Sequence, residues 1–477
     1  MRILVAVHGF PPTHSSGAER QAERAARWLA RHGHDVVVFA IEEVGAPHFR
    51  LEPHEQDGYL VYRMSYNVKE AESPFRGLYD HPLVGRTLRM VFARHAFDVV
   101  HVMSGYLLGP QAVDAAHECG LPVAITLTEY WFLCKQLNLL QPAGKLCTGP
   151  ETDMKCTRCV AEERRRYRWP ALVVPGLMDA LWKCGSHFSF AQETLLEVTR
   201  RRVALRRALD AAELVVCNSR FMIGTFSRFG FDTTRYALVK VGLEPPAVCV
   251  QRALEGPGHL RLGYIGQLKE HKGVDLLIDA VIRLLEGRHP VTLDIWGSET
   301  EEPAYVSKLK KRSTGYPAIR WNGRYTGARV WEVLAAMDAL AVPSRWYENS
   351  PNAILEAYLM RVPVVATNLG GMAELVEPEK CGLTFTLNDP DDLYDRLKRL
   401  ATEPGLLERL RDGIPPVKTI DEEMGELVEK YSQLCAGRFS AAASRASGPA
   451  CIESSQAAAK THAGGPLPDP GARLPAP

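Results

Sequence analysis

Apolar positions along the chain recur with periods that alternate between strand and helix. Residues 2–7 (RILVAV) form a β-branched run typical of a buried strand. In residues 17–33 apolar side chains recur every three or four positions until Gly33 ends the pattern, and residues 109–120 repeat that helical spacing. Further strands are predicted at residues 35–40, 98–103, 122–127, 213–219 and 237–242. This order is typical of an α/β domain.

The alternation begins again after a Pro/Gly-rich stretch in the middle of the chain. Strands are predicted there at residues 260–266, 291–297, 319–323, 339–344, 362–367 and 381–386, with helices at 274–287 and 328–337. We therefore expect two Rossmann-like domains with doubly wound parallel sheets, rather than one continuous sheet. The expected parts are a first domain at 1–245, a linker at 246–258, a second domain at 259–415 and a helix at 416–436 that packs back on the first domain.

Two segments depart from this pattern. Residues 129–190 are an insertion rich in Cys, Arg and Trp. Residues 437–477 are rich in Ala, Ser, Gly and Pro, a composition that cannot bury enough apolar surface to fold, so we expect a disordered tail.

Composition narrows the class of protein. The 477 residues are 46% hydrophobic and 24% charged, with a net charge of +1, so no global field attracts nucleic acid or an acidic membrane. No apolar run reaches the roughly 18–20 residues of a spanning helix, and the N-terminus lacks a secretory pattern. Eleven cysteines, an odd number, fit reduced thiols. We expect a cytoplasmic protein, with peripheral membrane contact as an option.

Residues 344–367 (SRWYENSPNAILEAYLMRVPVVAT) place two carboxylates around the start of a helix. The loop follows a predicted strand, Ser350 is predicted as the N-cap and Pro351 as the first helical residue. Free amides at such a helix start favour phosphate. Glu348 and Glu356 flank the amides, and carboxylates accept hydrogen bonds from vicinal hydroxyls. The motif therefore fits a diphosphate with a ribose on one side and a sugar on the other.

Four segments in this order resemble family 4 glycosyltransferases, which are retaining enzymes of the GT-B fold. They are the E-x7-E spacing, GYIGQLKEHKGVDLLIDA (263–280), TNLGGMAELV (367–376) and the N-terminal loop and helix in residues 8–40. The resemblance covers roughly residues 1–435 apart from the insertion, which suggests a subgroup with four cysteines inserted in the N-terminal domain. It implies two Rossmann-like domains facing a central cleft.

The resemblance also implies roles for single residues. Glu348 would hold the donor sugar's hydroxyls, Glu356 the ribose, and Lys272 would neutralise the diphosphate leaving group. Further donor contacts are implied for Gly17, Gln267, Asn349, Ser350, Asn352, Gly370 and Gly371. No catalytic divalent metal or other cofactor is then required.

Some positions depart from the family pattern. Gln267 stands where an Arg is usual, and Thr128-Glu129 where many relatives carry His-Asp. Glu129 is the best local substitute as a base, although the leaving phosphate can itself take the proton in retaining transfer. His8 and His101 are alternatives, each of which also reads as a structural histidine.

The insertion carries four cysteines in a C-x12-C-x8-C-x2-C array: Cys134, Cys147, Cys156 and Cys159. Four thiolates suit zinc or a [4Fe-4S] cluster; ordinary reduced cysteines and a redox disulfide are the alternatives. We expect such a site to shape the acceptor pocket or dock a partner rather than to catalyse. The following segment, 164–188, mixes Arg with Trp and aliphatic residues, which suits either a membrane surface and lipid-linked acceptor or a helix packed on the core.

The sequence thus favours a retaining hexosyltransferase that moves a sugar from a nucleotide-diphosphate donor to a hydroxyl acceptor. The acceptor would be a glycan, a lipid-linked glycan or a small molecule, as in polysaccharide biosynthesis, and no nucleic-acid partner is expected. One alternative is a nucleotide-sugar epimerase on the same fold. Another is a non-catalytic protein that senses metal or redox state through its cysteines. Turnover of a donor discriminates between these hypotheses.

Overall fold

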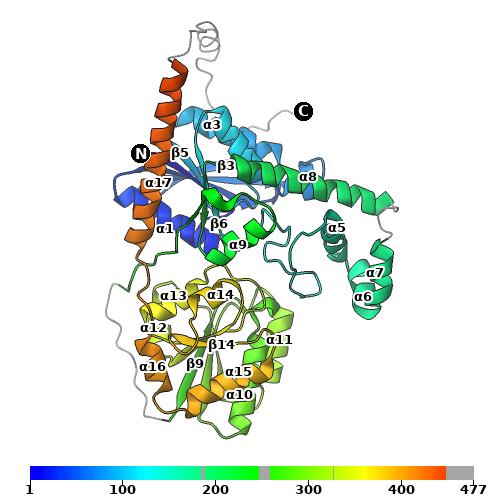
Figure 1. Ribbon diagram of the computed structural model, residues 1–477, viewed down its shortest axis with the longest axis vertical. Helices are drawn as coiled ribbons and strands as arrows, with labels where there is room; N and C mark the ends of the chain where they lie inside the picture. Colours follow the sequence, from blue (N-terminus) through cyan, green and yellow to red (C-terminus); the bar gives the residue numbers. More distant parts are fainter. Residues whose placement is uncertain (184–188, 247–257, 326, 447–477) are drawn as a thin grey trace. The chain divides into compact units, whose positions relative to one another are not determined.

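Two β-sheets with helices packed around them organise the chain (Figure 1). The computed structural model describes residues 1–183, 189–246, 258–325 and 327–446. Most of the predicted linker and all of the tail beyond residue 446 lie outside these described residues.

The first sheet has eight strands in the order β3-β4-β2-β1-β5-β6-β7-β8. Its strands are β1 (Arg2–Val7), β2 (Asp35–Glu43), β3 (Gly45–Gln56), β4 (Tyr59–Asn67), β5 (Val99–Val102), β6 (Val123–Leu127), β7 (Leu214–Cys217) and β8 (Tyr236–Leu238). All neighbours pair in parallel except β3 and β4, which pair antiparallel. The central strand β1 is buried from Ile3 to Val7, as its apolar run predicts.

The hairpin of β3 and β4 was not predicted from the sequence. β3 lies at the edge of the sheet and is largely exposed, and it carries prolines, histidines and charged residues. Such residues are tolerated at an edge because one row of backbone groups faces solvent there. The strand therefore has no apolar alternation by which sequence analysis could find it.

Helices α1, α3, α4, α8 and α9 accompany the first sheet, and the insertion adds α5 to α7 (Figure 1). Their bounds are α1 (Gly17–Arg31), η1 (Val68–Glu70), α2 (Pro74–Gly77), α3 (Pro82–Arg94), α4 (Gly109–Glu118), α5 (Asp153–Glu162), α6 (Arg165–Val173), α7 (Pro175–Lys183), α8 (Ser189–Ala211), α9 (Arg220–Arg228) and η3 (Thr233–Arg235).

The second sheet is parallel throughout, in the order β11-β10-β9-β12-β13-β14. Its strands are β9 (Leu260–Ile265), β10 (Val291–Trp296), β11 (Ile319–Gly323), β12 (Ala339–Val342), β13 (Val364–Thr367) and β14 (Gly382–Phe385). The helices are η4 (Glu270–Lys272), α10 (Val274–Glu286), α11 (Pro303–Arg312), η5 (Gly327–Arg329), α12 (Val330–Ala335), α13 (Asn352–Leu359), α14 (Gly370–Leu375), α15 (Pro390–Thr402) and α16 (Leu406–Asp412). The prediction of two parallel-sheet α/β units is confirmed.

The last helix, α17 (Ile420–Ala446), contributes Met424, Leu427 and Tyr431 to the same buried core as β1 and α1. The helix was expected to end at residue 436 and a disordered tail to begin at 437; the structure instead continues the helix to Ala446. The stretch Ser440–Ala446 contains four alanines, and alanine has the highest intrinsic helix propensity, which explains the extension. No helix in the described part of the chain is both long and apolar enough to cross a membrane.

Candidate active site

The loop after β12 holds a buried carboxylate by three donors on one oxygen. Glu348 is 7% exposed, and its Oε1 accepts from Lys272 Nζ at 2.7 Å, from Ser344 Oγ at 2.8 Å and from Trp346 Nε1 at 2.9 Å. No hydrogen bond joins Oε2 to any residue that the structure describes. One oxygen is therefore fixed by the protein, while the other keeps its capacity to accept from a ligand.

The basic step after β9 brings Lys272 to this carboxylate. Lys272 ends the short helix η4, and its Nζ lies 5.0 Å from the centroid of the Trp346 ring. Gly273 follows with φ +70°, and a Cβ there would lie 2.0 Å from the Pro343 carbonyl oxygen. Only glycine fits this position, so the close approach of the two loops depends on it.

Helix α13 begins one residue later than predicted. Pro351 is the N-cap, with φ −66° and ψ 115°, and Asn352 is the first helical residue, so Ser350 is not the cap. Proline also fits a cap because its φ suits extended backbone and it has no N–H to satisfy. Within the described residues, the backbone N–H groups of Asn349, Ser350 and Asn352 have no hydrogen-bond acceptor, which leaves them available to an anion.

The Asn349 side chain joins the two halves of the chain. Its Nδ2 donates to the Leu127 carbonyl oxygen at 2.9 Å, and its Oδ1 accepts from Ser219 Oγ at 2.6 Å. The neighbouring Tyr347 ring stacks on Phe221 with centroids 5.2 Å apart. The side chain of Asn349 thus has a structural role, and only its backbone amide is available to bind a nucleotide-sugar donor.

Glu356 lies in the second turn of α13 and faces two arginines of α1. Burial raises the pKa of Glu356, and the positive charges of Arg20 and Arg24 oppose that rise. The Arg24 guanidinium is buried, and its Nε and Nη2 have no hydrogen-bond partner in the described part of the chain. Sequence analysis missed both arginines, because a charged helix residue gives no signal until the fold brings it to another loop.

The remaining predicted donor residues differ in how they are placed. Gly371 N donates to the Glu348 carbonyl oxygen at 2.7 Å, and a Cβ on Gly371 would lie 1.7 Å from the Asn349 carbonyl oxygen. The close approach expected at Gly370 and Gly371 is therefore to the backbone of residues 348–349. Gly17 begins α1 and has open space where a Cβ would stand. Gln267 follows β9 with its side chain partly buried, and its carbonyl oxygen accepts from the Tyr264 hydroxyl.

Four polar side chains form a hydrogen-bonded network between α1 and the ends of β1, β5 and β6; Glu19 and Ser104 are buried, and His8 and Glu129 are partly buried. Glu19 contacts His8 Nε2 at 3.3 Å, His8 Nδ1 contacts Ser104 Oγ at 3.0 Å, and Ser104 Oγ donates to Glu129 Oε1 at 2.6 Å. Thr128 Oγ1 donates to the other oxygen of Glu129. Glu129 is therefore coupled to His8 through one hydroxyl.

Burial and ion pairing shift the pKa values of the titratable groups in this polar network. Burial opposes ionisation of Glu19, but the hydrogen bond and charge of His8 lower its pKa to about 2. Burial works against the charged form of His8, but Glu19 and Glu129 raise its pKa. Burial raises the pKa of Glu129. Ser104 has φ +133°, a conformation that a serine rarely adopts and that no sequence pattern reveals.

His101, the other histidine considered as a base, has a structural role in the core. It is fully buried between the Tyr431 hydroxyl at 2.5 Å and Thr126 Oγ1 at 2.7 Å. Burial lowers the pKa of His101 to about 3, so the ring stays neutral.

The four cysteines of the insertion line a single cavity of about 370 Å³. Cys156 and Cys159 lie one turn apart on α5, while Cys134 and Cys147 come from the preceding loop. Burial raises the pKa of Cys156 to about 12 and raises those of Cys134 and Cys159 as well. As the side chains stand, no three His, Cys, Asp or Glu residues in the described chain form a group that could hold one metal ion.

Two family models match the chain. Residues 16–149 match the model described as a glycosyl transferase 4-like domain, and residues 259–403 match that of glycosyl transferases group 1. Among curated proteins, the glycogen synthase of Mycobacterium tuberculosis is 23% identical over 411 residues, which span 86% of this chain and 88% of that protein. A D-inositol 3-phosphate glycosyltransferase of Corynebacterium jeikeium is 28% identical over 240 residues, 46% of this chain and 56% of that protein.

Solved structures show the same fold. HepE of Anabaena in complex with UDP and glucose has a TM-score of 0.60 at 16% identity, covering 91% of this chain and all of that one (100%). Sucrose-phosphate synthase of Thermosynechococcus elongatus has a TM-score of 0.62 at 14% identity, covering 92% of this chain and 100% of that one. The predicted GT-B fold is thereby confirmed.

Proposed function

We propose that this chain, built as a GT4-type glycosyltransferase of the GT-B fold, is a retaining hexosyltransferase. It would transfer a hexose from a nucleotide-diphosphate donor to a hydroxyl group, with retention of configuration at the anomeric carbon. The single observation that carries the proposal is the hydrogen bonding of the Glu348 carboxylate. Three donors fix its Oε1, while Oε2 and the three nearby backbone amides have no hydrogen-bond partner in the described part of the chain. This arrangement fits a sugar hydroxyl next to a diphosphate.

In this proposal Lys272 and the α13 amides carry the main electrostatic task. The bond between the anomeric carbon and the diphosphate oxygen breaks, and negative charge develops on the leaving group. Lys272 Nζ, 2.7 Å from Glu348, would share its charge between that carboxylate and the diphosphate. Amides at Asn349, Ser350 and Asn352 would donate to the same oxygens. The proposed reaction needs no divalent cation for this role.

The acceptor proton has two possible destinations. In retaining transfer on one face of the sugar, the leaving phosphate oxygen lies beside the incoming hydroxyl and can take its proton. Glu129 is the second candidate, because burial raises its pKa toward the range useful for a base and His8 polarises it through Ser104. We assign the proton to the phosphate and give Glu129 the role of orienting the acceptor.

Glu356 and the two arginines opposite it would bind the nucleotide part. A carboxylate pairs with the two hydroxyls of a ribose, and Glu356 lies about one turn from the free amides. Arg24, two of whose buried nitrogens have no hydrogen-bond partner among the described residues, would donate to a phosphate or ribose oxygen once the nucleotide sugar binds.

The insertion supports an acceptor carried on lipid. Helices α6 and α7 expose Trp169 (61%), Leu172 (57%) and Leu177 (60%), and Arg164 to Arg168 add cations beside them. Exposed aromatic and aliphatic side chains next to arginines are typical of contact with an anionic membrane surface. We therefore specify the acceptor as a lipid-linked hydroxyl compound.

The experiment is a thermal-shift screen of nucleotide-diphosphate sugars, followed by NMR of the product formed from the stabilising donor. Free nucleotides and sugar 1-phosphates serve as controls. We expect one donor to raise the melting temperature and to give a product with the donor's anomeric configuration. An inverted product would contradict retention. Conversion of the donor sugar without an acceptor would indicate an epimerase, and binding without turnover would indicate a non-catalytic protein.

A further inference from the structure

A buried arginine beside the four cysteines has no counter-ion among the residues that the structure describes. Arg201 on α8 is 6% exposed, stacks 4.2 Å over the Trp131 ring and donates to the Trp131 carbonyl oxygen. Its Nε has no hydrogen-bond partner, and no carboxylate within the described residues pairs with it. Cys134, Cys156 and Tyr79 lie near enough to interact electrostatically with its guanidinium. Burial of a guanidinium without a nearby anion destabilises a protein by several kcal/mol, so a negatively charged group is expected next to Arg201.

Three other cations that line the same cavity have carboxylate partners. Lys135 pairs with Glu163, Arg158 with Glu162, and Arg202 with Asp153 at 2.7 Å. Lys145 also lines the cavity, but its side chain is exposed to solvent, whereas Arg201 is buried. Four cysteine thiolates with one divalent cation carry a net charge of two minus, which a buried guanidinium would balance.

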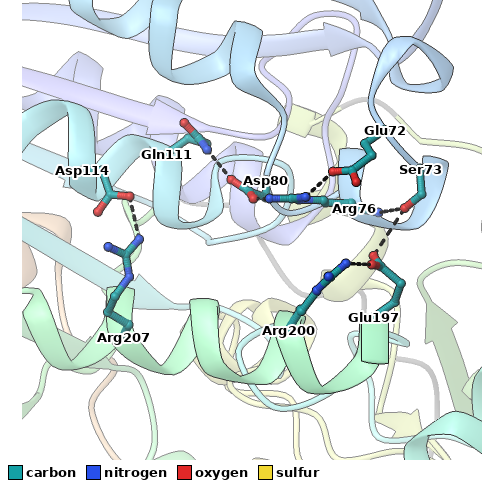
Figure 2. A network of polar contacts seen from close by, with 9 residues as sticks. All are labelled: Glu72, Ser73, Arg76, Asp80, Gln111, Asp114, Glu197, Arg200 and Arg207. Atoms are coloured by element: carbon teal, nitrogen blue, oxygen red, sulfur yellow. Dashed lines mark hydrogen bonds and ion pairs between the residues drawn. The ribbon is translucent and has the colours of Figure 1, made fainter. Parts of the chain in front are cut away.

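Separate anchors hold the walls of the cavity. α8, which carries Arg201, is tied to the first domain by Arg207 with Asp114 at 2.6 Å and by Ser73 with Glu197 at 3.4 Å (Figure 2). α5, which carries the CxxC pair, is tied to α8 because Arg202 and Thr199 donate to Asp153.

The loop that carries Cys147 is fixed in a different way. Gly149 has φ +124° and lies against Phe229, whose Cζ would be 1.8 Å from any Cβ. The cysteines therefore come from anchored elements that converge on one space rather than from a loose loop.

We propose that Cys134, Cys147, Cys156 and Cys159 bind a thiolate-ligated metal centre whose negative charge is balanced by Arg201. In a mononuclear zinc site all four sulfurs bind one ion at about 2.3 Å. As they stand the thiols line a cavity of about 370 Å³ without forming such a group. In a [4Fe-4S] cluster each thiolate binds a different iron, so the iron, sulfide and zinc content of the protein distinguishes the two forms.

The first test measures iron, acid-labile sulfide and zinc in full-length protein purified without oxygen, with an absorption spectrum of the same sample. We expect about four irons and four sulfides per chain, and about one zinc if the mononuclear form is present instead. The double variant Cys156→Ser/Cys159→Ser should lose the metal, whereas Cys119→Ser, at an exposed cysteine outside the insertion, should retain it. Wild-type protein without iron or zinc, also after reconstitution with iron and sulfide or with zinc, would overturn the proposal.

Thiol alkylation keeps the test independent of folding of the double variant. In wild-type protein the four cysteines should resist alkylation until a chelator is added, while Cys119 reacts at once. Equal labelling with and without chelator would overturn the proposal.

The role of Arg201 has its own test. Arg201→Gln should release metal to a chelator about tenfold faster than wild type. Arg200→Gln, on the same helix but with a side chain that is 50% exposed and paired only within that helix, should not change the rate. Equal release from Arg201→Gln and wild type would remove the charge-balancing role. Metal content and release are measured without donor or acceptor, so they stand or fall separately from glycosyl transfer.

Discussion

At the scale of single residues, the candidate site depends on charges held out of water. The buried carboxylate of Glu348 pairs with the partly buried Lys272, and removal of either partner would leave the other charge uncompensated. Glu19 and His8 form a second pair in the polar network. These pairs make the chemistry of the site sensitive to single substitutions and to pH.

Glu348→Gln should lower the rate of sugar transfer by about 100-fold or more, because the charge that orients Lys272 and binds the sugar hydroxyl is lost. Steady-state kinetics with the identified donor measures the effect. Glu377→Gln, at an exposed carboxylate paired with Lys380, is the matched control and should leave the rate unchanged. Unchanged turnover in Glu348→Gln would remove the proposed site.

Glu19 should make stability depend on acid in a defined window. Its pKa falls from an ordinary 4.5 to about 2 on folding, mainly because His8 outweighs burial, so the ionised form stabilises the folded state above pH 4.5. That contribution, about 3 kcal/mol at most, should disappear as the pH falls from 4.5 toward 2. Urea denaturation across this range should show the difference between wild type and Glu19→Gln shrinking. A difference that stays constant with pH would contradict the assignment.

At the scale of elements, the functional loops are positioned by close backbone contacts. The start of α14 presses against the loop before α13 at Gly371, and the start of α10 presses against the end of β12 at Gly273. Two loops that are far apart in sequence therefore hold the carboxylate and the lysine together.

Gly371→Ala should destabilise the protein by about 1–3 kcal/mol and weaken donor binding, because its Cβ would displace the Asn349 carbonyl. Gly425→Ala is the matched control: it lies inside α17 with open space around a Cβ and should stabilise by about 0.5–1 kcal/mol. Chemical denaturation and a donor titration measure both effects. Equal stability changes in the two variants would show that the loop contact is not tight.

The exposed face of α6 and α7 should bind anionic vesicles through its apolar side chains. Trp169→Ser/Leu177→Ser should weaken co-sedimentation with vesicles containing phosphatidylglycerol by about tenfold, since burial of each large side chain contributes about 1.5–3 kcal/mol when complete. Leu196→Ser, at a position on α8 that is 50% exposed, should have little effect. No binding by wild type would contradict a membrane-borne acceptor.

At the scale of the whole molecule, the C-terminal helix packs on the N-terminal domain. α17 follows the second sheet in sequence, yet Met424, Leu427 and Tyr431 pack with β1 and α1. Tyr431 is fully buried and reaches His101 on β5. The first core is therefore completed by the C-terminal helix.

Tyr431→Ala should lower the free energy of unfolding by about 3–5 kcal/mol, because it opens a cavity and removes the hydrogen-bond partner of His101 Nδ1. Glu429→Ala, two residues earlier on the exposed face, should change stability by less than about 0.5 kcal/mol. Thermal and urea unfolding test this pair. Tyr431→Ala with wild-type stability would show that the helix does not complete the core.

Periodicity and local motifs determined a large part of this protein from sequence. The parallel strands were found because both faces of such sheets are buried and their residues form continuous apolar runs. The E-x7-E motif of Glu348 and Glu356 and the Lys272-Gly273 step could be found because each lies in a contiguous motif with strict spacing. The edge strand β3 and the extension of α17 were missed, because an exposed edge carries no apolar pattern and alanine-rich sequence is compatible with helix as well as disorder.

The sequence by itself therefore determined the fold class, the order of elements and the short motifs, all of which depend on interactions between near neighbours in the chain. Only the tertiary structure decided which distant groups meet. It placed Lys272 on Glu348, Arg24 opposite Glu356, His8 and Ser104 on Glu129, and Arg201 beside the four cysteines. These contacts arise from the packing of whole sheets and helices, and no local period or spacing records them.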